Sequence, residues 1–400
     1  MSTFLPPSES ELDPARQEQA RHYARLERRL MLLDLALGSA YLLTWLAGGW
    51  SQRLKAALQA LSAPYPYLDH PWLQVAGFAA VFFGLLFLLD LPLNFYSSYV
   101  LPKRFGLSTQ SLSGWLGDLL KSGLIGGLLG LLVLEVIYAV LRAAPQTWWL
   151  WAAAFLLLFN VLLANLAPLL LMPLFYKFTP LGEAYADLEA RLLRLAEQAG
   201  VSLRGVYQFD MSRRTKAANA ALTGLGNTRR ILLGDTLLRE FSPDEIETVL
   251  AHELAHHLHK DIPLGIAVQS LLTLLGLYLA SVGLKVGTAA LGFAGPADFA
   301  ALPLFVLVIG LYSLVTLPLG NAYSRWRERL ADEYALHATG NGSAFASAMT
   351  RLANQNLAEA DPEPWVEFLL HSHPALNKRI ALARQFSPVS EPAPPPAPNP

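Results

Sequence analysis

The chain has no cysteine among its 400 residues and carries little charge of either sign. Without cysteine, disulfide bridges are excluded, and a metal site must use histidine or carboxylate ligands instead of thiolate. Lysine and arginine together number 30, against 31 aspartate and glutamate residues, which leaves a formal net charge of −1. Because the chain has no basic footprint, we expect no nucleic-acid partner.

Charged residues make up only 15% of the chain, whereas 53% is hydrophobic. This balance is too apolar for an ordinary soluble enzyme and predicts several membrane spans joined to a polar part. A helix needs about 20 apolar residues to cross a bilayer. The fourth of the segments that meet this condition contains Pro168 and Pro173, and we expect it to kink. In total six segments qualify, at approximately 30–50, 74–96, 120–141, 147–176, 262–284 and 301–322.

Basic residues near the ends of these segments indicate orientation, because cytoplasmic flanks are enriched in lysine and arginine. The loops after spans one, three and five carry only one or two basic residues each. The flanks before span one and after span six are richer, with Arg16, Arg21, Arg25, Arg28 and Arg29 in the first and Arg325, Arg327 and Arg329 in the second. We therefore place both termini and residues 177–261 in the cytoplasm, in a multi-pass protein surrounded by membrane lipid.

The two ends of the chain differ in composition from the apolar segments between them. Residues 1–29 lack the apolar core and cleavage site of a secretory signal, so the first span is expected to remain as an anchor. Residues 387–400 are dominated by proline and alanine and are predicted to form a disordered tail.

Residues 252–256 read His-Glu-Leu-Ala-His. On a helix, His252 and His256 leave the same face and can hold one metal ion, while Glu253 can reach the attacking water. Ser242-Pro243-Asp244-Glu245 is a capping box with proline at the first helical position, so a helix is predicted to start there and include the motif. The alternative is a chance occurrence of the motif on a solvated helix.

A catalytic zinc requires three protein ligands and an open fourth position. Glu328 is the best candidate for the third ligand, although a glutamate in a charged helix is usually only solvated. Asp332 lies four residues later on the same face, where it can accept a hydrogen bond from a ligand imidazole. The sequence thus predicts one Zn²⁺ per chain and hydrolysis of peptide bonds, with Glu253 as the general base.

An oxyanion that forms during hydrolysis needs a hydrogen-bond donor. His373, in His371-Ser-His373-Pro374, and the nearby Arg379 are candidates for this role. The alternative for His373 is a structural role in a turn, which is common for a histidine before proline.

Residues 181–242 are predicted to form a helix at 183–200 followed by three short strands at 205–210, 216–222 and 230–233. Gly224, Gly226 and Asn227 are expected to form the turn between the last two strands. The edge of this sheet can bind an extended peptide by strand addition. The alternative is a hairpin that only supports the metal-binding helix.

Three acids, Asp34, Asp90 and Glu135, lie inside or at the edge of apolar segments. One interpretation is that these acids line a water-filled cavity or a translocation path. The other is that they pair between helices or lie near the membrane interface, and the sequence supports both equally. Small-x-x-x-small patterns in the third span predict close helix packing in preference to a chemical role, at Gly123, Gly126, Gly127 and Gly130.

Taken together, the motifs resemble the integral-membrane type 1 CAAX prenyl proteases and their relatives, the membrane gluzincins. The resemblance extends from about Leu91 to Arg384. It rests on Met172-Pro-Leu-Phe175-Tyr-Lys177-Phe-Thr-Pro180-Leu, Asn219-Ala220, Arg230-Ile-Leu-Leu-Gly-Asp235-Thr236-Leu237, His252-Glu253-x-x-His256, Ser324-Arg-x-x-Glu328-x-x-Ala331-Asp332-x-x-Ala335 and Ser372-His373-Pro374-x-x-x-x-Arg379-Ile380.

The resemblance implies zinc ligands at His252, His256 and Glu328, and support from Asp332, His373 and Arg379. It also implies that Asn219 and Ala220 bind substrate. The expected fold is mainly α, a polytopic helical barrel around a wet chamber with a small cytosolic α+β zinc-metalloprotease domain.

The chain departs from the eukaryotic members in having six spans instead of seven, and residues 105–110 follow their pattern only loosely. A bacterial cell membrane is therefore the expected location. The substrate is a peptide or protein, with removal of a C-terminal tripeptide from a prenylated CAAX protein as the resemblance suggests. Quality-control proteolysis of membrane proteins is an alternative, and a transporter with a structural metal is a more distant one.

These inferences predict six regions along the chain. They are a cytosolic N-terminal segment at 1–29, spans one to four at 30–176, a catalytic region at 177–261, spans five and six at 262–322, a third-ligand helix with a C-terminal motif at 323–386, and the tail at 387–400.

Overall fold

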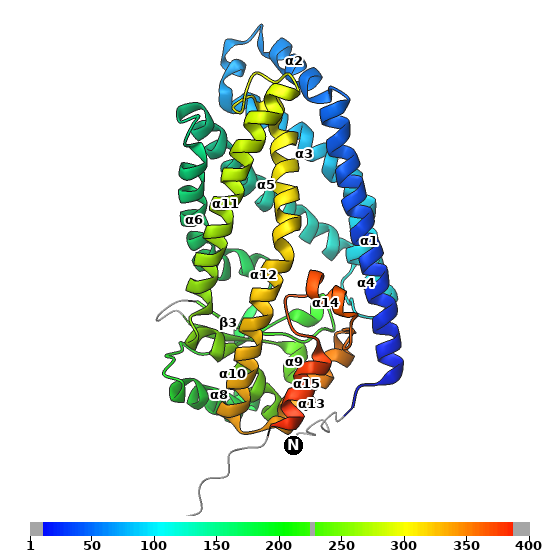
Figure 1. Cartoon of the computed structure of the whole chain (residues 1–400). Coiled ribbons are helices and arrows are strands. Elements are labelled where there is room, and N and C mark those ends of the chain that lie inside the picture. Colours follow the sequence, from blue (N-terminus) through cyan, green and yellow to red (C-terminus); the bar gives the residue numbers. More distant parts are fainter. Residues whose placement is uncertain (1–10, 225–228, 387–400) are drawn as a thin grey trace, which may run out of the picture.

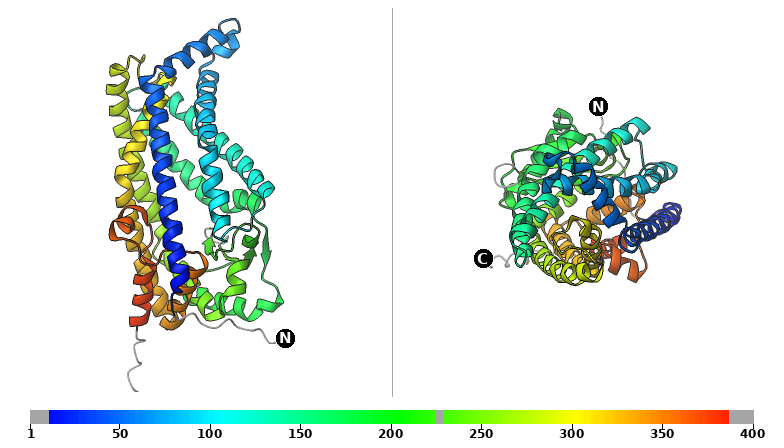
Figure 2. Two further views of the ribbon diagram at one scale, coloured as in Figure 1. Left: turned by 90° about the vertical axis from the view of Figure 1, so that its right-hand side faces the viewer. Right: turned by 90° about the horizontal axis from the view of Figure 1, so that it is seen from above.

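The computed structural model describes residues 11–224 and 229–386, and most of them are helical (Figure 1). The long helices run along one axis, and the short helices and the sheet gather at one end, where α10 (Pro243–Leu258) packs against α12 (Leu302–Thr339). Seen from above, the long helices are arranged around that axis (Figure 2). Gly226 and Asn227 of the predicted turn, and the predicted tail at 387–400, lie outside the described residues.

Six helices in the described part of the chain are long and apolar enough to cross a membrane, as predicted. Their outward leucines are exposed, for example Leu120 at 72% and Leu158 at 69%, as expected for side chains that face lipid. The helices are longer than the predicted segments, because polar residues extend them beyond the apolar part. They are α1 (Pro14–Ala47), α3 (Pro71–Phe95), α5 (Leu112–Ala143), α6 (Trp148–Leu166), α11 (Asp261–Ala290) and α12 (Leu302–Thr339).

Two of these helices continue through irregular turns. The fourth span passes from α6 into a π-helical turn at Ala167–Leu171 and then into α7 (Met172–Phe175). The expected irregularity therefore occurs at Pro168 and Pro173, since proline cannot donate the helical hydrogen bond. A similar π turn at Tyr96–Val100 joins α3 to α4 (Leu101–Arg104).

Glycines determine how closely α11 and α12 pack. A Cβ atom at Gly276 would lie 2.7 Å from the Tyr312 ring, and one at Gly283 would lie 3.0 Å from Val308. The prediction of close packing through Gly123, Gly126, Gly127 and Gly130 is wrong, since their Cβ positions have no heavy atom within 4 Å. Spacing alone does not say which face of a helix meets a neighbour.

The polar end contains a four-stranded sheet with the order β1-β2-β4-β3. The strand β1, at Phe178–Pro180, was not predicted, and β3 starts at Ala220 and not at Lys216. The strand β4 pairs in parallel with β2 and antiparallel with β3, which leaves β3 at the edge. The strands are β1 (Phe178–Pro180), β2 (Val206–Phe209), β3 (Ala220–Thr223) and β4 (Arg230–Gly234).

Short helices surround this sheet and form a hydrophobic core with it. Leu192, Ile231, Leu250 and Phe345 are almost completely buried in it. The helices are α8 (Ala186–Gln198), α9 (Asp235–Glu240), α10 (Pro243–Leu258), α13 (Gly342–Gln355), α14 (Pro364–Leu370) and α15 (Leu376–Gln385). A separate helix, α2 (Trp50–Ser62), lies at the opposite end (Figure 1).

Candidate metal centre

The helix that carries His252 and His256 starts at the predicted capping box. Ser242 Oγ accepts a hydrogen bond from the Glu245 backbone N–H, and the Glu245 carboxylate accepts one from the Ser242 N–H at 2.7 Å. The other Glu245 oxygen accepts a 2.5 Å hydrogen bond from Ser347 on α13. These contacts fix the position of α10 against α13.

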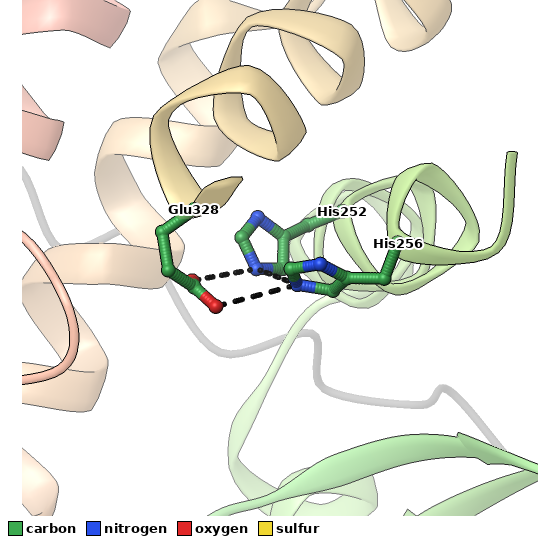
Figure 3. A group of neighbouring side chains, drawn as sticks. All are labelled: His252, His256 and Glu328. Carbon is green, nitrogen blue, oxygen red and sulfur yellow. Dashed lines mark hydrogen bonds and ion pairs between the residues drawn. The ribbon is translucent and has the colours of Figure 1, made fainter. Parts of the chain in front are cut away.

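The structure brings His252, His256 and Glu328 together, with one ligand atom of each lying within 4.8 Å of the others. The two Nε2 atoms are 3.2 Å apart, and the Glu328 carboxylate oxygens lie 3.2 Å from one and 3.4 Å from the other. Figure 3 shows the two imidazoles leaving α10 toward the carboxylate on α12. A helix of 38 residues thus brings Glu328 from a membrane span to the motif helix.

A carboxylate also lies behind each imidazole. The Nδ1 atom of His252 is 2.9 Å from Asp332, and that of His256 is 2.7 Å from Asp261. With a proton on each Nδ1, both Nε2 atoms present lone pairs to the same point. Glu328 Oε2 is buried there without a hydrogen-bond donor. Two such imidazoles and a carboxylate are a donor set that fits a divalent cation such as zinc.

The electrostatics of the site also favour positive charge between these residues. Burial by itself lowers the pKa of His252, but Asp332 and Glu328 outweigh this effect and raise it to about 9. For Glu253, burial raises the pKa, and the neighbouring histidines offset part of this rise. At His252 the raised pKa reflects the neighbouring carboxylates, which a cation would also neutralise, whereas at Glu253 it reflects burial of the carboxylate.

His373 and Arg379 lie in different environments. His373 Nε2 is 3.4 Å from Glu328 Oε1, and its side chain remains 60% exposed, so it faces the open side of the site. Arg379 is buried and donates to both oxygens of Asp332, at 2.8 and 2.6 Å. Of the two candidates for an oxyanion donor, His373 is therefore the better placed.

Asn219 and Ala220 lie where the chain enters the edge strand β3. The carbonyl of Asn219 accepts a hydrogen bond from the Gly234 N–H at 2.9 Å, and its side chain is exposed. Ala220 is the first residue of β3, which packs beside α10.

Sequence reasoning missed Asp261 and its partner Arg327. Arg327 Nε donates a 2.6 Å hydrogen bond to Asp261 Oδ1, which leaves Oδ2 for His256. The metal-binding helix α10 ends at Leu258 and α11 begins at Asp261, with the left-handed Lys260 (φ 56°) immediately before it. Asp261 therefore lies five residues after His256, beyond the end of the motif helix, and that spacing would have been its only signal.

A multi-pass membrane protein with this histidine and carboxylate cluster at its polar end is, by class, an integral-membrane metallopeptidase. Residues 183–387 match peptidase family M48, and residues 3–177 match the family described as "CAAX prenyl protease N-terminal, five membrane helices". The chain belongs to peptidase family M48.

Individual relatives agree with this assignment. The chain is 30% identical over 388 residues to an uncharacterized metalloprotease of Bacillus subtilis, YhfN, covering 96% of this chain and 87% of that protein. It is 28% identical to CAAX prenyl protease 1 of Saccharomyces cerevisiae, over 94% of this chain and 88% of the relative.

The fold is also similar to a solved structure. The crystal structure of S. mikatae Ste24p aligns with a TM-score of 0.84 and 26% identity, over 96% of this chain and 93% of the other. These comparisons confirm the predicted fold class and the predicted membrane metalloprotease activity.

Proposed function

We propose that this protein is a zinc endopeptidase that cleaves peptides near their C-termini, with prenylated CAAX-type tails as the preferred substrate class. The observation that carries the proposal is the convergence of His252, His256 and Glu328 beside the edge strand β3. The names of the yeast and plant relatives support the choice of substrate.

In this proposal the two histidines and Glu328 hold one zinc ion. The bound zinc supplies Lewis-acid polarisation of the scissile carbonyl and acidifies water. Glu253 removes the proton from the attacking water and delivers it to the leaving amine. His373 donates a hydrogen bond to the developing oxyanion, an effect worth about 3 kcal/mol in comparable sites.

Asp332 and Asp261 act through the imidazoles that they contact, since each keeps the proton on Nδ1. Arg379 holds the Asp332 carboxylate in place. Asn219 and Ala220 are proposed to bind the substrate backbone at the sheet edge.

We further propose that the polar end faces the cytoplasm of a bacterial cell. The arginine-rich flanks before the first span and after the last support this orientation. Asp34 and Asp90 line the same cavity of about 630 Å³ between α1, α3 and α12, so the two acids border one space within the bundle.

The test compares purified wild type with Glu253→Gln on a fluorogenic farnesylated peptide, on its unmodified form and on an unfolded membrane protein. We expect wild type to prefer the farnesylated peptide, and the variant to lose at least ~100-fold in kcat while it retains zinc. Equal turnover by the two proteins would contradict the mechanism. Cleavage of the unfolded protein alone would replace the CAAX assignment with a quality-control function.

A further inference from the structure

The backbone groups at the edge of β3 alternate in direction. Gly234 N–H donates to Asn219 O, and register places these two residues opposite each other. In an antiparallel pair, hydrogen-bonded and non-hydrogen-bonded positions alternate. Ala221 and Thr223 therefore turn toward β4, whereas Ala218, Ala220 and Leu222 direct their N–H and C=O groups to the open side.

The first of these outward positions is already occupied by a side chain of the protein. Ala218 N–H donates to Asn356 Oδ1 at 2.9 Å, and Asn356 Nδ2 donates to Ala218 O at 3.3 Å. The carboxamide thus makes the same two contacts that a residue of an added strand would make. A peptide that pairs with this edge cannot pair with Ala218 as well.

The open edge of β3 lies close to the catalytic base, because β3 packs beside α10, the helix that carries Glu253. From Ala218 to Leu222 the edge comprises five residues, or roughly 13 Å at the rise of a β-strand. Asn356 occupies the first of these positions, so only a short peptide segment can pair with the edge before it reaches Asn356.

The same residue forms part of the wall of the open space beside the metal centre. One cavity of about 690 Å³ is lined by Asn356 together with His373 and Arg379. Asn356 caps the end of α13, where its N–H donates to Leu352 O at 3.0 Å. The buried Leu357 that follows has a left-handed φ of 51°. Hydrogen bonds therefore hold both the backbone N–H of Asn356 and its side-chain carboxamide.

We propose that Asn356 terminates the substrate-binding edge and limits the number of residues on the C-terminal side of the cleaved bond. The direction follows from antiparallel addition, the more stable pairing, in which the substrate's C-terminal side runs from Leu222 toward Ala218. The limit is about four residues, and this positioning role rests on the proposed function. It would restrict the enzyme to short C-terminal fragments.

The experiment uses peptides that share the residues before the cleaved bond and carry two to ten residues after it. For each length, kcat and KM are measured and the released fragment is identified by mass spectrometry. Wild type is expected to lose kcat/KM once the segment exceeds about four residues. In Asn356→Ala, the ratio of kcat/KM for long over short peptides should rise about tenfold, mainly through KM, since two competing hydrogen bonds are removed.

Two further variants make the result specific. Gln355→Ala is the matched control, because Gln355 donates to Lys216 O at 2.7 Å next to the edge but does not occupy Ala218. It should retain the wild-type length profile. Asn356→Asp keeps the size of the side chain and the acceptor for Ala218 N–H, but it replaces the Nδ2 donor with an oxygen that faces Ala218 O, so it should give a length profile between those of wild type and Asn356→Ala.

An unchanged length profile in both Asn356 variants, with cleavage intact, overturns the role of Asn356 and leaves the proposed function standing. Failure of wild type to cleave any peptide, with zinc bound, overturns the proposed function itself.

Discussion

The membrane bundle and the polar end are both mainly helical, but they differ in whether their buried charged side chains have hydrogen-bond or ion-pair partners. At the polar end, Asp332 is paired with Arg379 and Glu245 accepts from Ser347. In the bundle, Glu135 is only 5% exposed, and neither of its carboxylate oxygens has a hydrogen-bond partner.

Buried ion pairs are costly to assemble, and they are retained where they fix the position of other groups. At the polar end, the groups so positioned are the imidazoles of His252 and His256. The comparison indicates that buried charged side chains are paired where they hold the proposed metal ligands in position.

The largest expected effect follows from removing a proposed ligand at the polar end. Glu328→Ala should abolish stoichiometric zinc binding and lower peptidase activity more than ~1000-fold, because a catalytic zinc needs three protein ligands. Zinc content by elemental analysis and kcat on the farnesylated peptide measure this. Glu333→Ala is the control, since Glu333 lies on the same helix but forms its ion pair with the exposed Arg329. Full zinc content in Glu328→Ala would remove this residue from the ligand set.

The next effect tests the paired charges directly. Arg379→Met should destabilise the polar end by about 3–5 kcal/mol, because it leaves the buried Asp332 carboxylate without its partner. Thermal unfolding in detergent measures the change. Arg329→Met, which removes an exposed arginine, should alter stability by less than ~1 kcal/mol. Equal shifts in the two variants would show that pairing at Asp332 is not what distinguishes the regions.

Within the bundle, packing and not charge is expected to control stability. Gly283→Leu should cost about 1–3 kcal/mol, since its side chain would overlap Val308 on α12. Gly127→Leu should change stability by less than ~0.5 kcal/mol, because the space beside Gly127 is open. The same unfolding assay compares them, and a reversed order would contradict the helix contacts described above.

The smallest expected effect compares the loss of stability when each of two buried glutamates is replaced by glutamine. Glu135→Gln should leave stability within ~1 kcal/mol of wild type, because no hydrogen bond to the carboxylate is lost. Glu245→Gln should lower stability by about 2 kcal/mol, since its carboxylate accepts hydrogen bonds from Ser242, Ser347 and Arg351. A larger loss at Glu135 than at Glu245 would remove the distinction.

Much of the fold could be predicted from the chain alone. The number of spans follows from the length of apolar segments, and the start of α10 follows from the Ser242 capping box. Both signals are local, because they depend on residues within one helix. The short strand β1 carries no such signal, since three residues of strand have no periodicity.

What failed depended on contacts between distant segments. The stripe at Gly123–Gly130 has the spacing of a packed helix face but meets no neighbour, whereas Gly283 does. Asp261 was missed because it lies beyond the end of the motif helix, where helical periodicity no longer predicts which side chains meet.

The sequence by itself determined the class of chemistry, since two histidines four apart on a capped helix present their ring nitrogens on one face. It also determined the membrane setting, since long apolar segments have no other stable environment. Only the tertiary structure decided that Asp261 meets His256 and that Asn356 lies against the edge of the sheet at Ala218. Those choices depend on how α12 and α13 pack against α10, and packing between distant segments is not encoded in any local period of the chain.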